Sequence, residues 1–242
     1  MQLFYSKDIE PGGLCTLDPE ESRHAVRVLR KRLGDEISLT DGRGRLFRCR
    51  IAVADDRACT VEAIASEPLI CQPACSIRLA VAPTKNPARM EWLVEKAVEV
   101  GVGEISLIEC DHSERSFLKT DRLERIALSA MKQSLHTLLP QINAPMKLKD
   151  WIAAHQTSPA HCQKLIAHCE AGQPRVPLAA ALTAGNDAAV LIGPEGDFSP
   201  DEIDRALAAG FTPVSFGSAR LRTETAALYA VAAFNLINDR TP

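Results

Sequence analysis

The chain has 242 residues, of which 46% are hydrophobic and 24% charged, and its formal net charge is −3. This length suits one large domain or two smaller ones, and the charge excludes a global attraction to nucleic acid, so any basic surface must be local. No run reaches the roughly 18 apolar residues of a membrane helix, and MQLFYSKDIE lacks the features of a signal peptide. We therefore expect a cytoplasmic protein without a membrane partner.

Residues 1–70 are predicted to form a small β-barrel domain with one helix. The segment EISLTDGRGRLFRCRIAVADDRACTVEAIA contains three strand-like runs separated by the turn sequences DGRG and ADD. In the middle run, apolar residues from Phe47 to Val53 alternate with a set that includes Arg48 and Arg50, so one face is apolar and the other carries arginine. Ahead of these runs, SRHAVRVLRKRLG predicts a short helix over 22–34.

The same region concentrates positive charge. Residues 23–50 contain nine lysine or arginine residues against three acidic ones, which is typical of phosphate contact, although a solvated surface is an alternative interpretation. Aromatic residues make up only 5% of the chain, which favours recognition of structured RNA by backbone and shape over base stacking. The candidate RNA-binding residues are Arg23, Arg27, Arg30, Lys31, Arg32, Arg48 and Arg50, extended by Arg115 and Lys132.

Residues 74–242 alternate between apolar strands and helices, a pattern that predicts a parallel sheet covered by helices on both faces. The predicted strands are 76–82, 104–110, 164–169, 188–192 and 212–216, and the predicted helices are 86–101, 121–139, 200–210 and 223–238. Local signals support two of these helices. Asn86 and Gly101 suit the ends of the first, and Ser199 with Glu202 forms a capping box for the third.

The loops after three predicted strands hold the candidate site, because ligands of open parallel sheets bind beyond the carboxyl ends of the strands. These loops are APTKNP, GPEGDFSP and GSARLRTETA. The second loop is glycine-rich but matches neither phosphate-binding motif, and its acids Glu195 and Asp197 oppose a pyrophosphate. It suits a cationic ligand with an adenosine part, such as S-adenosylmethionine, which Gly193 and Gly196 would let the backbone approach closely. A plain helix-capping loop is the alternative.

The third loop adds a second indication. Arg222 precedes a predicted helix start, where a cation is unfavourable unless an anionic group meets it, so we interpret Arg222 as a substrate-contacting residue. Glu224 suits the same helix start electrostatically.

The eight cysteines give no C-x₂-C pair. His161, Cys162, His168 and Cys169 could be considered as zinc ligands, but their spacing favours free thiols in a reducing compartment, and we expect no metal.

LIGPEGDFSPDEI followed by FGSARLRTETAALYAV resembles the closing motifs of the bacterial 16S rRNA (uracil-N3)-methyltransferase family, in the SPOUT superfamily of knotted S-adenosylmethionine enzymes. TKNPARMEWLVEKAVEVGV and SERS are similar to the same family, and RHAVRVLRKRLGD with DGRG resembles its PUA-like RNA-binding domain. The resemblance covers nearly the whole chain. The segment AMKQSLHTLLP departs from the commoner family pattern at Lys132, Leu135 and His136.

The resemblance implies an α/β fold with two domains. Residues 1–70 would form the PUA-like RNA-binding β-barrel, and residues 74–242 would form the SPOUT methyltransferase domain with a C-terminal trefoil knot. It also implies a homodimer that transfers a methyl group from S-adenosylmethionine to N3 of one uridine in the 16S rRNA of the small ribosomal subunit, leaving S-adenosylhomocysteine.

The resemblance also implies roles for individual residues. The implied cofactor-binding residues are Thr84, Leu191, Ile192, Gly193, Pro194, Glu195, Gly196, Phe216, Gly217, Leu221 and Arg222. Because uracil N3 carries a proton at neutral pH, Glu224 or Glu195 is a candidate to accept it, and Arg222 a candidate to stabilise the resulting charge. Two alternatives remain: a non-catalytic RNA-binding or ribosome-assembly protein on the same fold, and a small-molecule enzyme that uses a nucleotide.

Overall fold

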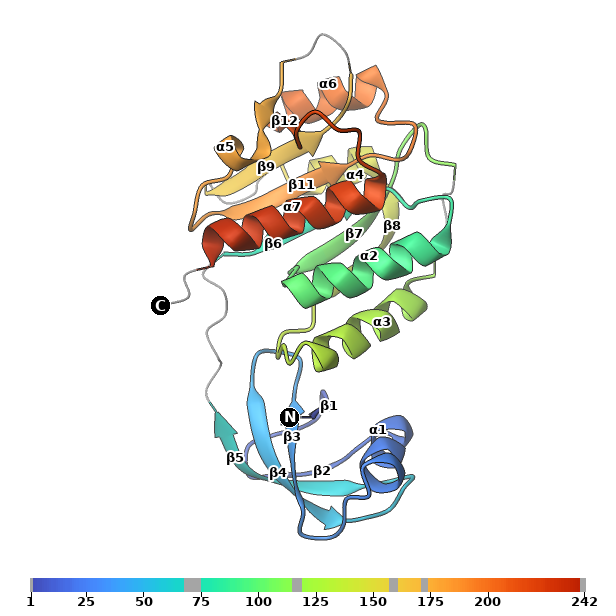
Figure 1. The fold of residues 1–242 in the computed structure, drawn as a ribbon, viewed down its shortest axis with the longest axis vertical. Helices are drawn as coiled ribbons and strands as arrows, with labels where there is room; N and C mark the ends of the chain where they lie inside the picture. The colour runs from blue at the N-terminus through green and yellow to red at the C-terminus, as the bar shows by residue number, and fades with distance from the viewer. Residues whose placement is uncertain (1, 68–74, 115–118, 157–160, 171–173, 240–242) are drawn as a thin grey trace. The chain divides into compact units, whose positions relative to one another are not determined.

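The structure is a computed structural model. It describes residues 2–67, 75–114, 119–156, 161–170 and 174–239 (Figure 1). By its contacts the chain divides into two compact units: unit 1 comprises Met1–Gln72 and Leu128–Leu139, and unit 2 comprises Pro73–Ala127 and Pro140–Pro242. Within the described ranges, no helix is both long and apolar enough to cross a membrane.

Unit 1 contains a five-stranded sheet in the order β1-β3-β4-β5-β2. Its strands are β1 (Leu3–Tyr5), β2 (Leu14–Thr16), β3 (Glu36–Thr40), β4 (Leu46–Val53) and β5 (Thr60–Glu67). Phe47, Cys49 and Ile51 of β4 are buried as the alternation predicts, but Val53 is exposed. A register shift between Ile51 and Val53 breaks the alternation there, because a bulge turns the following side chains away from the core.

The helix of unit 1 is shorter than predicted and begins earlier. Asp18 caps α1 (Pro19–Arg23) by accepting hydrogen bonds from two backbone N–H groups, and a π-helix, η1 (His24–Val28), follows directly. The predicted extent of 22–34 is therefore wrong. Arg30 adopts a left-handed φ of 55°, which ends the helical path, and the apolar Leu33 beyond it is exposed to solvent.

Helix α3 (Thr120–Gln133) also ends before the predicted residue 139. Leu135 has a left-handed φ of 61°, and the residues after it join unit 1. Thr40 Oγ1 donates to Thr137 O at 3.1 Å, and Leu139 N donates to Gly42 O at 2.9 Å. Pairing with the β3–β4 turn therefore replaces the last helical turn and a half that the sequence pattern predicts.

Unit 2 contains a seven-stranded, fully parallel sheet in the order β10-β12-β9-β11-β6-β7-β8. Its strands are β6 (Ile77–Val81), β7 (Glu104–Glu109), β8 (Gln141–Lys147), β9 (Cys162–Ala167), β10 (Val176–Pro177), β11 (Asp187–Ile192) and β12 (Thr212–Ser215). The five strands predicted from the sequence form its centre. The edge strands β8 and β10 were not predicted, because they lack the apolar runs of buried strands.

Helices cover both faces of this sheet (Figure 1). They are α2 (Pro87–Val100), α4 (Leu148–Ala154), α5 (Leu178–Ala181), α6 (Pro200–Ala208) and α7 (Thr223–Asn238). Helices α2 and α7 lie side by side on one face, and α4 and α6 pack on the other around Trp151, Ile203 and Phe211. The local signals at the helix ends are confirmed: Asn86 caps α2, Gly101 ends it in a left-handed conformation, and Ser199 forms a capping box with Glu202.

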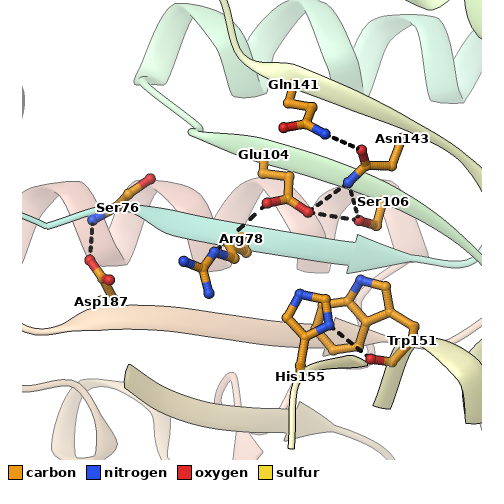
Figure 2. Close-up of polar contacts among 9 residues, drawn as sticks. All are labelled: Ser76, Arg78, Glu104, Ser106, Gln141, Asn143, Trp151, His155 and Asp187. Atoms are coloured by element: carbon orange, nitrogen blue, oxygen red, sulfur yellow. Dashed lines mark hydrogen bonds and ion pairs between the residues drawn. The ribbon is translucent and has the colours of Figure 1, made fainter. Parts of the chain in front are cut away.

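The amino ends of β6, β7 and β8 carry a polar network (Figure 2). Glu104 Oε1 accepts hydrogen bonds from Asn143 Nδ2 at 2.6 Å and from Ser106 Oγ at 3.1 Å, and Arg78 Nε lies 3.7 Å from Glu104 Oε2. Gln141 Nε2 donates to Asn143 Oδ1 at 2.7 Å. The network links three neighbouring strands through satisfied polar contacts and leaves the opposite, carboxyl ends of the sheet to the loops described next.

Candidate functional site

A cavity of about 940 Å³ lies at the carboxyl ends of β9, β11 and β12 in unit 2. This is the position at which parallel sheets bind ligands. Its described walls are residues 167–170 after β9, Arg175, residues 192–195 and 197 after β11, residues 214–223 from the end of β12 to the start of α7, and Arg89 and Ala226.

The loop after β11 is held in place by its own backbone and by the loop after β9. Asp197 has a left-handed φ of 64°, and its Oδ2 accepts a hydrogen bond from Cys169 N at 2.6 Å. The ring of Phe198 packs so closely on Gly193 that a Cβ there would lie 3.1 Å from two ring atoms. A larger residue at 193 would therefore require the buried ring of Phe198 to shift by a few tenths of an ångström. The carboxylate of Asp197 is engaged by the protein rather than free for a ligand.

The loop after β12 meets the loop after β11 through one hydrogen bond. Gly217 adopts a φ of 96°, which favours glycine, and the chain turns from there into α7. Thr223, the first residue of α7, donates from Oγ1 to Gly193 O at 3.1 Å, and this bond is buried. The structure thus brings the two loops singled out in the sequence to one shared cavity.

Most of the residues expected to bind a cofactor line this cavity, but three do not. Those on its walls are Ile192, Gly193, Pro194, Glu195, Phe216, Gly217, Leu221 and Arg222. Thr84 and Leu191 are fully buried outside the described walls, and Thr84 Oγ1 donates to Asn86 O at 2.9 Å. Gly196 lies against His112, whose Cβ would be 3.1 Å from a Cβ at 196.

The two candidate bases occupy different surroundings. Glu195 is exposed at the rim of the cavity, where its Oε1 accepts a hydrogen bond from Lys85 N at 3.3 Å. Glu224 is buried and lies outside the described walls; its Oε1 is 3.6 Å from Arg89 Nε, and its Oε2 has no hydrogen-bond partner. Glu224 therefore borders the cavity through Arg89, a wall residue that the sequence analysis did not single out.

Positive charge gathers at the rim. Arg175, Arg220 and Arg222 are exposed wall residues, and Arg175 Nη1 donates to His168 O at 2.6 Å. Arg222 occupies the N-cap position of α7 and makes no side-chain capping bond. Its guanidinium pairs with no carboxylate among the described residues, which leaves it available to an anionic group on a ligand.

His168 is a second wall residue whose position the sequence analysis did not predict. It is 4% exposed, its Nδ1 accepts a hydrogen bond from Glu170 N at 3.2 Å, and its Nε2 has no partner among the described residues. Burial is the largest influence on its pKa and lowers it below the usual 6.5, helped by Arg175 and opposed by Asp197 and Glu170. The sequence analysis placed it inside the predicted strand 164–169 and considered it only as a possible zinc ligand. Among the described residues, no three histidine, cysteine or acidic side chains are grouped as a metal site.

The basic residues of unit 1 differ in how far their charge is already compensated. Arg23, Arg30 and Arg32 are exposed, and Lys31 Nζ donates to Glu36 O at 3.0 Å. Arg27 pairs with Asp56, Arg48 and Arg50 lie 3.9 Å and 3.5 Å from Glu36, and the ammonium of Lys132 binds the buried Glu21. Arg115 lies outside the described residues.

Comparisons with known proteins match both parts of the chain. A family model described as an RNA methyltransferase domain matches residues 71–235, and one described as an RNA methyltransferase PUA domain matches residues 17–64. The ribosomal RNA small subunit methyltransferase E of Aquifex aeolicus is 30% identical over 238 residues, which are 96% of this chain and 97% of that protein.

Two solved structures are similar over nearly the whole chain. A probable rRNA-methyltransferase from Porphyromonas gingivalis is 45% identical, with a TM-score of 0.90 and 98% of each chain covered. A ribosomal RNA small subunit methyltransferase E from Neisseria gonorrhoeae, solved bound to S-adenosyl methionine, is 27% identical, with a TM-score of 0.81 and the same coverage.

Proposed function

The chain belongs to a family of RNA methyltransferases, and several of its relatives are named ribosomal RNA small subunit methyltransferase E. We therefore propose that it methylates the RNA of the small ribosomal subunit with S-adenosylmethionine. The observation that carries the proposal is the cavity at the carboxyl ends of β9, β11 and β12, closed by the bond between Thr223 and Gly193. We further propose that the methyl acceptor is N3 of one uridine in 16S rRNA.

The cavity fits the proposed cofactor in size and chemistry. Its volume lies in the range of small-molecule sites, and its inner wall is formed by buried, uncharged residues that include Ile192, Gly193 and Val214. The acids Glu170 and Glu195 lie at the rim, where they complement the positive charges of the cofactor. S-adenosylmethionine supplies an electrophilic methyl group on a sulfonium, and its product is S-adenosylhomocysteine.

The residues at the rim can supply the remaining chemistry. Uracil N3 must lose a proton. Of the two candidate bases, Glu195 is an exposed wall carboxylate that can accept it, whereas Glu224 is buried against Arg89. Arg222, unpaired at the start of α7, can stabilise the negative charge that then spreads over N3 and the flanking carbonyl oxygens. Because N3 lies on the base-pairing edge, the target base must enter the cavity unpaired.

Replacement of Arg222 tests this assignment. We expect Arg222→Ala to lower kcat by about 10²-fold, as removal of a charge-stabilising group does elsewhere, while the melting temperature stays unchanged. The matched control is Arg205→Ala on α6, an exposed arginine that is not one of the cavity's wall residues. The assay is methyl incorporation into small-subunit rRNA from a strain that lacks the enzyme, followed by mass spectrometry of the modified nucleoside.

Three outcomes would contradict the proposal. If Arg222→Ala turns over at the wild-type rate, the role proposed for Arg222 is contradicted. If the methyl group is found on an atom other than uracil N3, the proposed acceptor is wrong. If the wild-type protein does not bind S-adenosylhomocysteine in calorimetry, the proposal that it is a methyltransferase is contradicted, and a non-catalytic ribosome-assembly protein is favoured.

We also propose that the two parts of the chain have different roles: residues 1–70 bind RNA, and residues 74–242 transfer the methyl group. The two family matches, over residues 17–64 and 71–235, support this division.

The proposal includes a homodimer formed through α2 and α7, which lie side by side and expose large apolar side chains. These side chains are Trp92, Val100, Tyr229 and Leu236.

The trefoil knot implied by the resemblance stays a prediction. Mechanical stretching of single molecules held by the two ends tests it, because a tightened knot shortens the unfolded chain. An unfolded length that equals the full extension of 242 residues would contradict the knot.

A further inference from the structure

His168 combines three properties that the proposed reaction does not explain. It lines the cavity at the end of β9, its side chain is buried, and one of its two ring nitrogens has no hydrogen-bond partner. A buried polar atom left without a partner costs about 1–3 kcal/mol, so its retention beside a ligand cavity requires an explanation.

The hydrogen bond at Nδ1 fixes which nitrogen carries the proton. Glu170 N can only donate, so Nδ1 of His168 must accept, and the neutral ring then carries its hydrogen on Nε2. The lowered pKa keeps the ring neutral at physiological pH. His168 therefore presents an uncharged N–H donor that has no hydrogen-bond partner among the described residues and is closed to solvent.

The buried position of His168 favours a contact with the bound cofactor over a contact with the RNA base. The charged wall residues Arg175, Glu195 and Arg222 are exposed at the rim, whereas His168 belongs to the buried inner wall. A methyl donor bound in the cavity would lie between the inner wall and the RNA base, because the base reaches the methyl group from the open side. An uncharged donor in a buried wall suits an uncharged acceptor, since a carboxylate buried there without a cation would be costly.

We propose that the Nε2–H group of His168 donates a hydrogen bond to an uncharged acceptor, a ribose oxygen or an adenine ring nitrogen, on the adenosine part of the bound cofactor. This inference rests on the proposed function, and it names a binding contact at the same site. Because Nε2 is closed to solvent in the structure, this contact requires the ring to turn towards the cavity when the ligand binds, and satisfaction of the unpaired donor favours that movement.

Two ligands and two substitutions test the contact by calorimetry. The ligands are S-adenosylhomocysteine and 5′-methylthioadenosine, which keeps the adenosine part and lacks the amino acid part. His168→Phe keeps the ring shape without any N–H, and His168→Gln keeps a donor near the position of Nε2. The control pair is His161→Phe and His161→Gln, at an exposed histidine just before β9 that does not line the cavity.

We expect His168→Phe to lower the affinity for both ligands by the same factor, about 3- to 10-fold, as loss of one uncharged hydrogen bond does. His168→Gln should recover part of the loss, and the His161 variants should bind as the wild type does. Wild-type affinity of His168→Phe for both ligands overturns the proposal. A loss confined to S-adenosylhomocysteine also overturns it, because the contact would then be with the amino acid part. Normal ligand binding with slow methylation overturns it in favour of a contact with the RNA.

A second measurement needs no substitution and covers the case in which His168→Phe does not fold. In protein labelled with ¹⁵N-histidine, the Nε2–H resonance of His168 should shift when S-adenosylhomocysteine is added, and an unmoved resonance overturns the proposal. If the wild-type protein binds neither ligand, the proposed function itself fails, which is distinguishable from failure of the His168 contact alone.

Discussion

Thr223 is the residue at which the two cavity loops meet, because its hydroxyl donates to the carbonyl oxygen of Gly193. The structure shows no side-chain capping bond at the start of α7. The hydroxyl therefore joins two loops that are about 30 residues apart in the sequence.

We expect Thr223→Val to lower the affinity for S-adenosylhomocysteine about 3- to 10-fold, because the loss of this bond frees one loop from the other. Thr223→Ser should restore the affinity, since it keeps the hydroxyl. Thr225→Val, at an exposed position on the same helix, is the control. Calorimetry measures all four proteins, and equal affinities for Thr223→Val and the wild type would show that the bond is dispensable.

Individual site residues were predictable where their chemistry is unusual for their position. Gly193 stands out in the sequence because glycine permits close backbone approach, and Arg222 because a cation at a helix start is unfavourable. Gly196 was singled out for the same reason as Gly193, but it is not one of the cavity's wall residues. His168 and Arg89 carry no such local signal. They become wall residues only because the parallel sheet brings the end of β9 and the start of α2 to the same cavity.

At the scale of elements, local signals predicted helix ends well where a side chain completes the backbone hydrogen bonding. In the capping box of α6, the side chain of Ser199 accepts from Glu202 N and the side chain of Glu202 accepts from Ser199 N. The helix predicted over 121–139 was wrong at its end because its last residues pair with Gly42 and Thr40, which are distant in the sequence. Periodicity reports on neighbours along the chain and cannot detect such a partner.

The contact between α1 and the end of α3 within unit 1 depends on one buried ion pair. Glu21 is 3% exposed and binds the ammonium of Lys132 through Oε1, while its Oε2 has no partner. Burial raises the pKa of Glu21 above the usual 4.5, and Lys132 opposes that rise. The pair therefore holds a carboxylate in an environment that would otherwise protonate it.

We expect Lys132→Met to lower the free energy of unfolding by about 3 kcal/mol at pH 7.5, because it leaves Glu21 buried without its cation. The double variant Glu21→Gln with Lys132→Met should recover most of that loss. The deficit of Lys132→Met should also shrink as the pH falls towards 4.5, since a carboxyl whose folded pKa is raised stabilises the fold in its protonated form. Urea denaturation across this pH range measures both effects, and a deficit that is independent of pH would contradict them.

At the scale of the whole molecule, charge is distributed unevenly although the net value is only −3. Residues 23–50 are strongly basic, so the rest of the chain is acidic. Much of this basic charge is compensated within unit 1, as the pairs of Arg27 with Asp56 and of Arg50 with Glu36 show. Arg23, Arg30 and Arg32 are the clearest candidates for phosphate contact, because they are exposed and form no ion pair among the described residues.

We expect Arg27→Ala with Arg30→Ala to weaken binding to small-subunit rRNA and to reduce the slope of log affinity against log salt by about 1 to 2. Each lost phosphate contact removes close to one released counterion. The control is Lys149→Ala with Arg205→Ala, which removes the same charge from exposed positions on α4 and α6. Equal slopes for the two double variants would mean that net charge, and not the basic segment, governs binding.

The proposed homodimer can be tested by a substitution on the exposed face of α7. Leu236 on α7 is 79% exposed, and Tyr229 lies two turns earlier on the same face of that helix. We expect Leu236→Glu to convert the dimer to monomer at micromolar concentration, because a charge would be buried without a partner. Leu33→Glu, at a 72% exposed leucine of unit 1, is the control. Sedimentation velocity measures the oligomeric state of each protein, and a monomeric wild type would contradict the proposed homodimer.

The broad architecture was predictable because apolar strands that alternate with helices have few stable arrangements. A parallel sheet with helices on both faces satisfies that pattern, and the structure has one. The order of the strands was not predictable from periodicity. β12 pairs with β9 instead of with β11, its nearest predecessor among the central strands, and this choice depends on how the connections cross.

The two bonds that join the cavity loops both end on main-chain atoms, the amide of Cys169 and the carbonyl of Gly193. Main-chain groups persist whatever side chain a mutation introduces. Rim positions such as 169, 170 and 218–220 can therefore drift during evolution without loosening the scaffold, and descendants of one ancestor could acquire different RNA targets while they keep the same methyl donor.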